Sequence, residues 1–148
     1  IKTKSNKFSF KGKIELANHG LTHCVVGRHL PKLIGSNRKH HREFWPDLPQ
    51  QIHTEHILKS QQILENYFET PITIFVPPGN VWSYKTYLAL QKTNIKKIIA
   101  SKYMQDSQEK MQGVEFINDQ KNYFCFHDKE LKEKGESWLL KQIKNKNL

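Results

Sequence analysis

The sequence predicts an α/β fold, built on a parallel sheet or barrel, in a single domain that spans residues 1–148. Residues 72–76 form a β-branched run, residues 83–94 carry apolar side chains at helical spacing, and residues 97–100 form another apolar run. A strand, a helix and a strand in this order are typical of a βα repeat. Neighbouring strands of such a repeat run parallel, which is the basis of the predicted class.

Composition and charge narrow the classes of function. The net charge is +10, but only Arg28, Arg38 and Arg42 could make the bidentate contacts that arginine makes with phosphate or guanine. The chain also lacks a glycine-rich phosphate loop, so we expect no nucleic-acid partner. No run of eighteen or more apolar residues occurs, so we expect no membrane span. A lysine-rich surface that attracts acidic polymers agrees with the charge.

The amino-terminal part brings two histidines to the end of a strand. Residues 1–13 are polar and basic, and we interpret them as a connecting segment at a truncated edge of the domain. Residues 14–17 predict a strand that ends at Asn18, and His19 and His23 follow it. Because the imidazoles lie four positions apart, a tight turn could direct both at one divalent metal. The alternative is two unrelated polar side chains in a loop.

A long irregular segment and a helix come next. Residues 27–48 contain glycines, prolines and a basic run, and a loop of this length is usually functional or disordered. The Trp45 ring could stack on a sugar, or it could fix the loop to the core, and the sequence favours neither. Apolar residues at helical spacing predict a helix over residues 49–68. We assign His53 and His56 to the surface of this helix.

The remaining elements continue the βα pattern. The strand at residues 72–76 stops at a proline-rich turn, and Ser83 is placed to cap the helix that follows. Residues 114–117 and 123–127 predict two further strands, and residues 136–145 predict a closing helix.

Three of the predicted strands end in residues that suit chemistry. His19 and His23 follow the first strand, the turn at residues 77–80 follows the next, and His127 closes a late strand. Active sites of parallel sheets and barrels collect at the carboxyl ends of the strands. We therefore interpret the three features as parts of one site.

Four stretches of the chain, taken in order, resemble the polysaccharide deacetylases, the NodB-like enzymes of carbohydrate esterase family four. Residues 15–23 resemble the His-x-x-x-His metal motif, and residues 75–80 resemble the loop that follows a middle strand. Residues 95–101 resemble the next strand, and residues 124–128 resemble the late strand that ends in a catalytic histidine. These stretches run across most of the chain.

The resemblance implies a distorted (β/α) barrel, incomplete at its N-terminal end, that hydrolyses N-acetyl or O-acetyl groups on a carbohydrate. It implies a divalent metal, zinc or cobalt, bound by His19, His23 and an Asp. His127 would be the general acid that protonates the leaving amine or alcohol, and the Gly79 N–H would stabilise the oxyanion. We expect Pro77, Pro78, Asn80, Trp82 and Trp45 to contribute to substrate binding.

Two departures from the family bear on activity. The family takes its catalytic base and third metal ligand from an upstream Asp-Asp pair, but no Asp precedes His19 and no such pair occurs. We expect the sequence to begin after that segment, so that the chain alone binds metal weakly and has little or no activity. The rival interpretation is a catalytically inactive basic module that binds acidic or sugar polymers. Val76 also stands where many members carry an Arg that orients the base.

Overall fold

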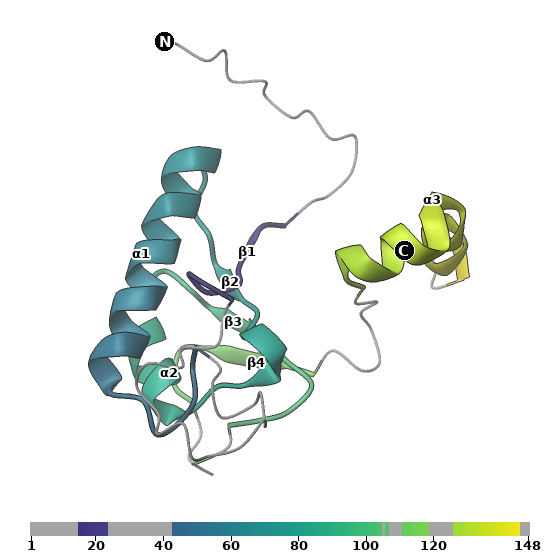
Figure 1. Ribbon diagram of the computed structural model, residues 1–148. Helices are drawn as coiled ribbons and strands as arrows, with labels where there is room; N and C mark the ends of the chain where they lie inside the picture. The colour runs from purple at the N-terminus through teal and green to yellow at the C-terminus, as the bar shows by residue number, and fades with distance from the viewer. Residues whose placement is uncertain (1–14, 24–42, 105, 107–110, 119–125, 146–148) are drawn as a thin grey trace.

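One parallel sheet forms the centre of the computed structural model, which describes residues 15–23, 43–104, 106, 111–118 and 126–145. The described strands lie in the order β1-β2-β3-β4. They are β1 (Ala17–Asn18), β2 (Ile74–Phe75), β3 (Lys97–Ile99) and β4 (Glu115–Ile117). In Figure 1 the helices α1 (Gln50–Phe68) and α2 (Tyr84–Leu90) lie on the same side of this sheet. The predicted α/β class and parallel arrangement are confirmed.

The register of the sheet brings the ends of its strands to one edge. Asn18 pairs with Phe75, and Phe75 pairs with Ile98. The Val76 N–H continues the ladder beyond β2 by donating to the Asn18 carbonyl at 2.9 Å. Because these strands are parallel, the segments that leave β1, β2 and β3 emerge at the same edge. His19, which follows β1 directly, therefore lies at this edge.

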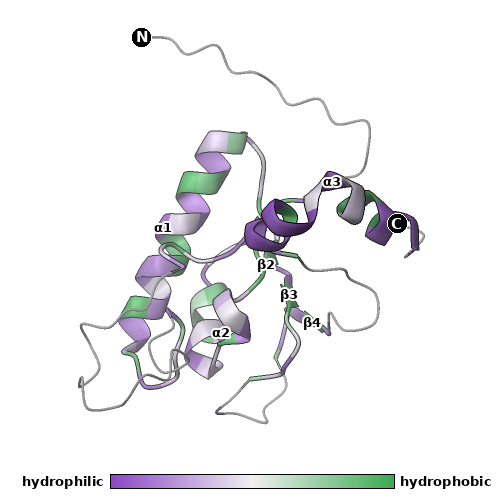
Figure 2. Cartoon of the chain, turned by 45° about the vertical axis from the view of Figure 1, so that its right-hand side comes forward, coloured by the Kyte–Doolittle hydropathy of each residue, from purple (hydrophilic) through white to green (hydrophobic). Residues whose placement is uncertain are grey.

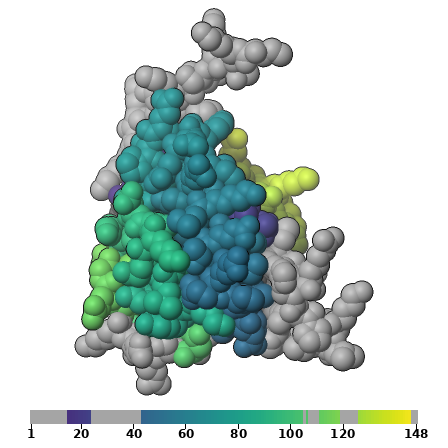
Figure 3. All heavy atoms as spheres, turned by 90° about the vertical axis from the view of Figure 1, so that its left-hand side faces the viewer, coloured from purple at the N-terminus to yellow at the C-terminus, as the bar shows by residue number. Residues whose placement is uncertain are grey.

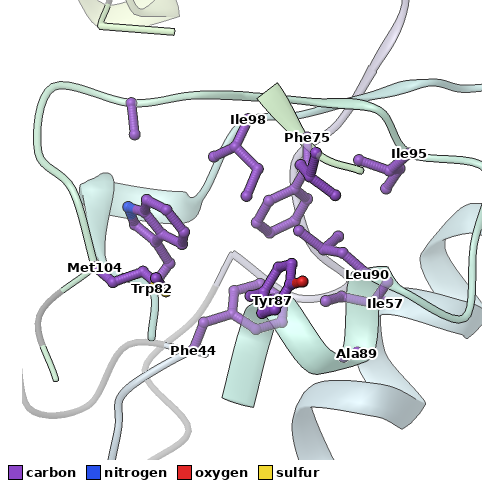
Figure 4. Packing of buried hydrophobic residues seen from close by; sticks show 12 residues of the cluster. Phe44, Ile57, Phe75, Trp82, Tyr87, Ala89, Leu90, Ile95, Ile98 and Met104 are labelled. Carbon is purple, nitrogen blue, oxygen red and sulfur yellow. The ribbon is translucent and has the colours of Figure 1, made fainter. Parts of the chain in front are cut away.

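The hydrophobic core fills the space between the sheet and its two covering helices. Phe75 and Ile98 from the sheet meet Ile57 from α1 and Leu90 from α2, and all four are fully buried (Figure 4). The Phe44 ring closes one end of the core, packing edge-on against Phe75 with ring centroids 5.3 Å apart. Burying side chains of this size stabilises the fold by about 1.5–3 kcal/mol each. Phe44 therefore fixes the segment before α1 to the sheet.

Local capping explains where α2 begins and ends. The Ser83 hydroxyl accepts from the Thr86 N–H, and the Thr86 hydroxyl accepts from the Ser83 N–H, which confirms the predicted cap. The helix ends at Leu90, earlier than the sequence predicted, because the Thr93 N–H and hydroxyl both donate to the Leu90 carbonyl in a turn. Figure 3 shows α1 and α2 side by side over the outer surface of the molecule.

The assignment of His53 to the helix surface is wrong. His53 is fully buried in α1, where its Nε2 lies 3.1 Å from the Trp45 carbonyl and its Nδ1 lies 3.0 Å from the Thr86 hydroxyl. A neutral ring with its proton on Nε2 satisfies both contacts, since Nε2–H donates to the carbonyl and Nδ1 accepts from the hydroxyl. Desolvation by burial lowers the pKa of His53 to about 4. His53 thus joins α1, the start of α2 and the preceding loop as an uncharged group.

The carboxyl-terminal part differs from the predicted strand and helix. The predicted strand at residues 123–127 falls largely outside the described residues, and Phe126 and His127 adopt no strand. The His127 carbonyl instead accepts from the N–H groups of Glu130 and Leu131, because helix α3 (Asp128–Asn145) starts there. α3 bends at Gly135, so the predicted closing helix corresponds to its second half. Hydrophilic residues predominate along α3 (Figure 2), and no described helix is long and apolar enough to cross a membrane.

We expect the free energy of unfolding to fall as the pH drops from about 7.5 to about 5, because the unfolded chain then binds more protons than the folded protein. The His53 ring is protonated near pH 6.5 in the unfolded chain and only near pH 4 in the folded protein. This group alone should remove about 2 kcal/mol over that range. Urea unfolding at both pH values measures the loss, and the non-titrating variant His53→Gln should lose about 2 kcal/mol less. Equal losses of unfolding free energy in the unaltered chain and in His53→Gln would contradict a buried, uncharged His53.

Candidate functional site

The turn after β1 is joined to α1 by the buried side chain of Asn18. Its Oδ1 accepts from the Gly20 N–H and from the Ser60 hydroxyl, each at 2.9 Å. Its Nδ2 donates to Gln61 Oε1 at 3.1 Å. Ser60 and Gln61 belong to α1, so these bonds fix the position at which the chain leaves the sheet toward the two histidines.

The buried carboxylate of Glu43 lies beneath the rest of this turn. Its Oε1 accepts from the Leu21 N–H at 2.7 Å, and its Oε2 accepts from the His23 N–H at 3.2 Å. The Thr22 N–H lies 3.3 Å from both carboxylate oxygens. His56 Nδ1 completes the group at 2.7 Å from Oε1. Three consecutive backbone amides and one imidazole therefore converge on a side chain with an exposed fraction of 0%.

These hydrogen bonds keep Glu43 ionised. Burial by itself raises the pKa of the Glu43 carboxyl, but the bonds from His56 and from the Leu21 and Thr22 amides outweigh burial and hold the pKa below its usual value. His56, which we assigned to the helix surface, is only 14% exposed, and its side chain is paired with Glu43. Sequence reasoning missed Glu43, whose only signal was an acidic residue after a basic run.

His19 and His23 lie close together above this carboxylate. Their ring centroids are 4.7 Å apart and the rings are tilted by 43°. Two imidazoles on one tetrahedral zinc ion, with Zn–N distances of about 2 Å, have centroids about 5 Å apart. The 4.7 Å between the His19 and His23 ring centroids is close to this value.

The orientation of His19 is set by the end of β2. Its Nδ1 lies 2.6 Å from the Val76 carbonyl, and a carbonyl only accepts, so the ring carries its proton on Nδ1. This leaves the Nε2 lone pair able to bind a metal, the arrangement in which metal-ligating histidines usually occur. The contact uses the backbone of Val76, so the absence of an Arg side chain there does not affect it.

The charge state of His19 also suits a metal ligand. Desolvation lowers the pKa of His19, and its neighbours His23 and His127 lower it further by like-charge repulsion. The hydrogen bond to Val76 and the Glu43 carboxylate oppose this effect without reversing it. A neutral imidazole at neutral pH is the form that binds a metal ion.

The proline-rich turn follows Val76 directly. Pro77 and Pro78 are buried, and residues Pro78–Asn80 form a 3₁₀ turn, η2. Gly79 is exposed and has φ of 63°, a left-handed conformation that glycine adopts without strain. Asn80 Oδ1 accepts from the Ser101 N–H at 3.0 Å, which joins the turn to the segment after β3. Gly79 is thus presented to solvent at the same edge as His19.

The other predicted site residues differ in their surroundings. Trp82 is fully buried, donates from Nε1 to the Lys102 carbonyl at 2.9 Å and stacks on Phe116, so its side chain belongs to the core. Trp45 is half-buried, and its Nε1 donates to Asp47 at 3.0 Å. The side chain of His127 is 72% exposed at the start of α3, and it influences the pKa of His19.

The described residues contain no complete metal site. Within residues 15–23, 43–104, 106, 111–118 and 126–145, no three His, Cys, Asp or Glu side chains form a group that could hold a metal ion. Comparison with known proteins found no family model, no curated protein and no solved structure that matches the chain. Function must therefore be inferred from the residues themselves.

We expect nuclear magnetic resonance to find the proton of His19 on Nδ1 at neutral pH, because the Val76 carbonyl requires a donor there. Long-range nitrogen–proton spectra of the imidazoles distinguish the two neutral tautomers. His53 is an internal control with the opposite assignment, since its Nε2 faces the Trp45 carbonyl. A proton on Nε2 of His19 would contradict the proposed availability of that nitrogen.

Proposed function

We propose that the chain belongs to a metal-dependent hydrolase that removes N-acetyl or O-acetyl groups from a carbohydrate, as polysaccharide deacetylases do. One observation supports this proposal above all. The ring centroids of His19 and His23 lie 4.7 Å apart at the carboxyl end of β1, and Nε2 of His19 is available to a metal. The four parallel strands would be part of a distorted (β/α) barrel.

The surroundings of the pair support this proposal. Active sites of parallel α/β folds lie at the carboxyl ends of the strands, which is where β1 and β2 deliver His19 and the turn at residues 77–80. Gly79 offers an exposed backbone beside this edge, and His127 is close enough to affect the pKa of His19. These are the residues that the resemblance implies for one active site.

The residue types match the steps of deacetylation. A divalent metal, when bound, polarises an acetyl carbonyl and lowers the pKa of water. His19 and His23 would bind the metal through neutral imidazole nitrogens. The Gly79 N–H would donate a hydrogen bond to the developing oxyanion, and His127 would donate a proton to the leaving nitrogen or oxygen. Trp45 is the aromatic side chain that we assign to the sugar.

A third protein ligand and a catalytic base are required in addition. The resemblance implies that both are Asp residues of a segment upstream of His19, and the described residues hold no group of three His, Cys, Asp or Glu side chains that could bind a metal ion. Two imidazoles alone bind zinc or cobalt weakly, because zinc sites ordinarily use three or four protein ligands.

We expect the chain to bind Co²⁺ or Zn²⁺ weakly, with one ion for each protein molecule. His19→Ala or His23→Ala should weaken binding at least tenfold by removing one of two ligands. His41→Ala is the control, because it removes a histidine that the proposed site does not use, and it should bind as the unaltered chain does. Calorimetric titration measures these affinities. Equal weakening by all three substitutions would contradict a specific site.

In a protein that also contains an upstream Asp-Asp segment, we expect metal-dependent release of acetate from acetylated sugars. His127→Ala should lower kcat by about 10²-fold or more, because it removes a general acid. The double variant His19→Ala/His23→Ala should release none. Retained binding to sugar or acidic polymers with no acetate release, even from the unaltered protein, would instead support the basic binding module.

A further inference from the structure

We propose that Glu43 is a positioning residue for the metal-binding histidines. Its carboxylate would hold the backbone of residues 21–23 so that the imidazoles of His19 and His23 converge. The inference concerns how the pair is oriented, and its consequence for metal affinity rests on the proposed function.

Several hydrogen-bond donors surround the buried side chain of Glu43. Glu43 is fully buried, and its two oxygens accept from three consecutive amides, those of Leu21, Thr22 and His23. Burying a carboxylate is costly unless hydrogen bonds compensate for the lost water. The carboxylate and the turn above it therefore depend on each other.

The second argument is that residues 19–23 contain no helix or strand. Their backbone amides obtain partners from side chains instead, from Asn18 for Gly20 and from Glu43 for the next three. His23 has φ of 49°, a left-handed conformation that costs a residue with a Cβ about 1 kcal/mol or more. The bond from its N–H to Glu43 Oε2 offsets this cost and holds the backbone from which the His23 side chain extends.

The third argument is the close approach of Gly20 to the same carboxylate. Gly20 has φ of 83°, and a Cβ built at this position would lie 2.5 Å from Glu43 Oε2. Any larger residue at position 20 would displace the carboxylate from the backbone N–H groups that donate hydrogen bonds to it. The absence of a side chain at Gly20 therefore lets Glu43 reach the backbone of the turn.

The fourth argument is that Glu43 is itself held by rigid elements. His56, on α1, donates from Nδ1 to Glu43 Oε1 at 2.7 Å. The next residue, Phe44, is fully buried against Phe75 of β2. Glu43 thus fixes the turn that carries both histidines relative to α1 and the sheet.

Glu43→Gln tests the proposal with little change in volume. Glutamine has one acceptor oxygen and one donor nitrogen. The backbone N–H groups that now donate to one of the two carboxylate oxygens would face the NH₂ group, which cannot accept a hydrogen bond. Asp106→Asn is the matched control, because Asp106 Oδ1 also accepts a backbone N–H, that of Tyr84 at 2.8 Å, away from the turn.

The primary measurement is made by nuclear magnetic resonance on the metal-free chain. We expect a nuclear Overhauser effect between the His19 and His23 rings, together with slow exchange of the Leu21 and His23 amides. Glu43→Gln should lose both while the α1 and sheet amides keep their chemical shifts, and Asp106→Asn should lose neither. Metal affinity, measured by calorimetry, should fall about 10–100-fold in Glu43→Gln only, the usual effect of losing a group that orients a ligand.

A second pair of variants keeps the test decisive if Glu43→Gln does not fold. Gly20→Ala should displace the Glu43 carboxylate, weaken the contact between the rings and lower metal affinity at least tenfold. Gly113→Ala is its control, because Gly113 has a similar φ of 71° but nothing lies within 4 Å of an added Cβ. It should behave as the unaltered chain does in both measurements.

The outcomes separate this inference from the proposed function. Loss of the contact between the His19 and His23 rings in Glu43→Gln or Gly20→Ala supports positioning by Glu43, whether or not the chain binds metal. If the unaltered chain binds no metal, only the proposed function is overturned. Positioning by Glu43 would be overturned if the rings stay in contact and metal affinity stays unchanged in the folded variants. The metal site would stand if His19→Ala still weakens binding at least tenfold.

Discussion

The buried carboxylate of Glu43 is the interaction on which the geometry of the candidate site depends. An ionised group without exposure to water is stable only when its oxygens are fully hydrogen-bonded, and here the donors are three amides of the turn and the imidazole of His56. Because the same amides lie between His19 and His23, the electrostatic requirement of Glu43 also determines the backbone between the two rings. Stability and site geometry are therefore linked through one side chain.

The hydrophobic core makes this arrangement rigid. Phe44 is buried against Phe75, so its neighbour Glu43 is carried to a fixed position under the end of β1. The parallel sheet supplies the complementary constraint, since the pairing of β1 with β2 sets His19 beside the Val76 carbonyl. The imidazoles are thus oriented from two sides, by a strand end and by a carboxylate, and neither constraint requires a bound metal.

Elements with a strong local signal were predictable from the sequence. The β-branched run around β2, the apolar spacing of α1 and the cap at Ser83 are encoded in neighbouring residues, and the structure confirms them. Interactions between distant residues were not predictable. Periodicity could not reveal that His53 is buried against Trp45 and Thr86, that Trp82 fills the core, or that Glu43 reaches back to residues more than nineteen positions earlier. The spacing of His19 and His23 suggested convergence, but the groups that orient them come from three other segments.

We infer that a turn held by Glu43 presents His19 and His23 to one metal ion. Anomalous diffraction at the zinc absorption edge, from crystals of the chain soaked in Zn²⁺, tests it most directly. We expect one anomalous-difference peak about 2 Å from His19 Nε2 and about 2 Å from a ring nitrogen of His23. A peak at other histidines only, with the His19 ring still bonded to the Val76 carbonyl and the two rings still close together without metal, would contradict this arrangement.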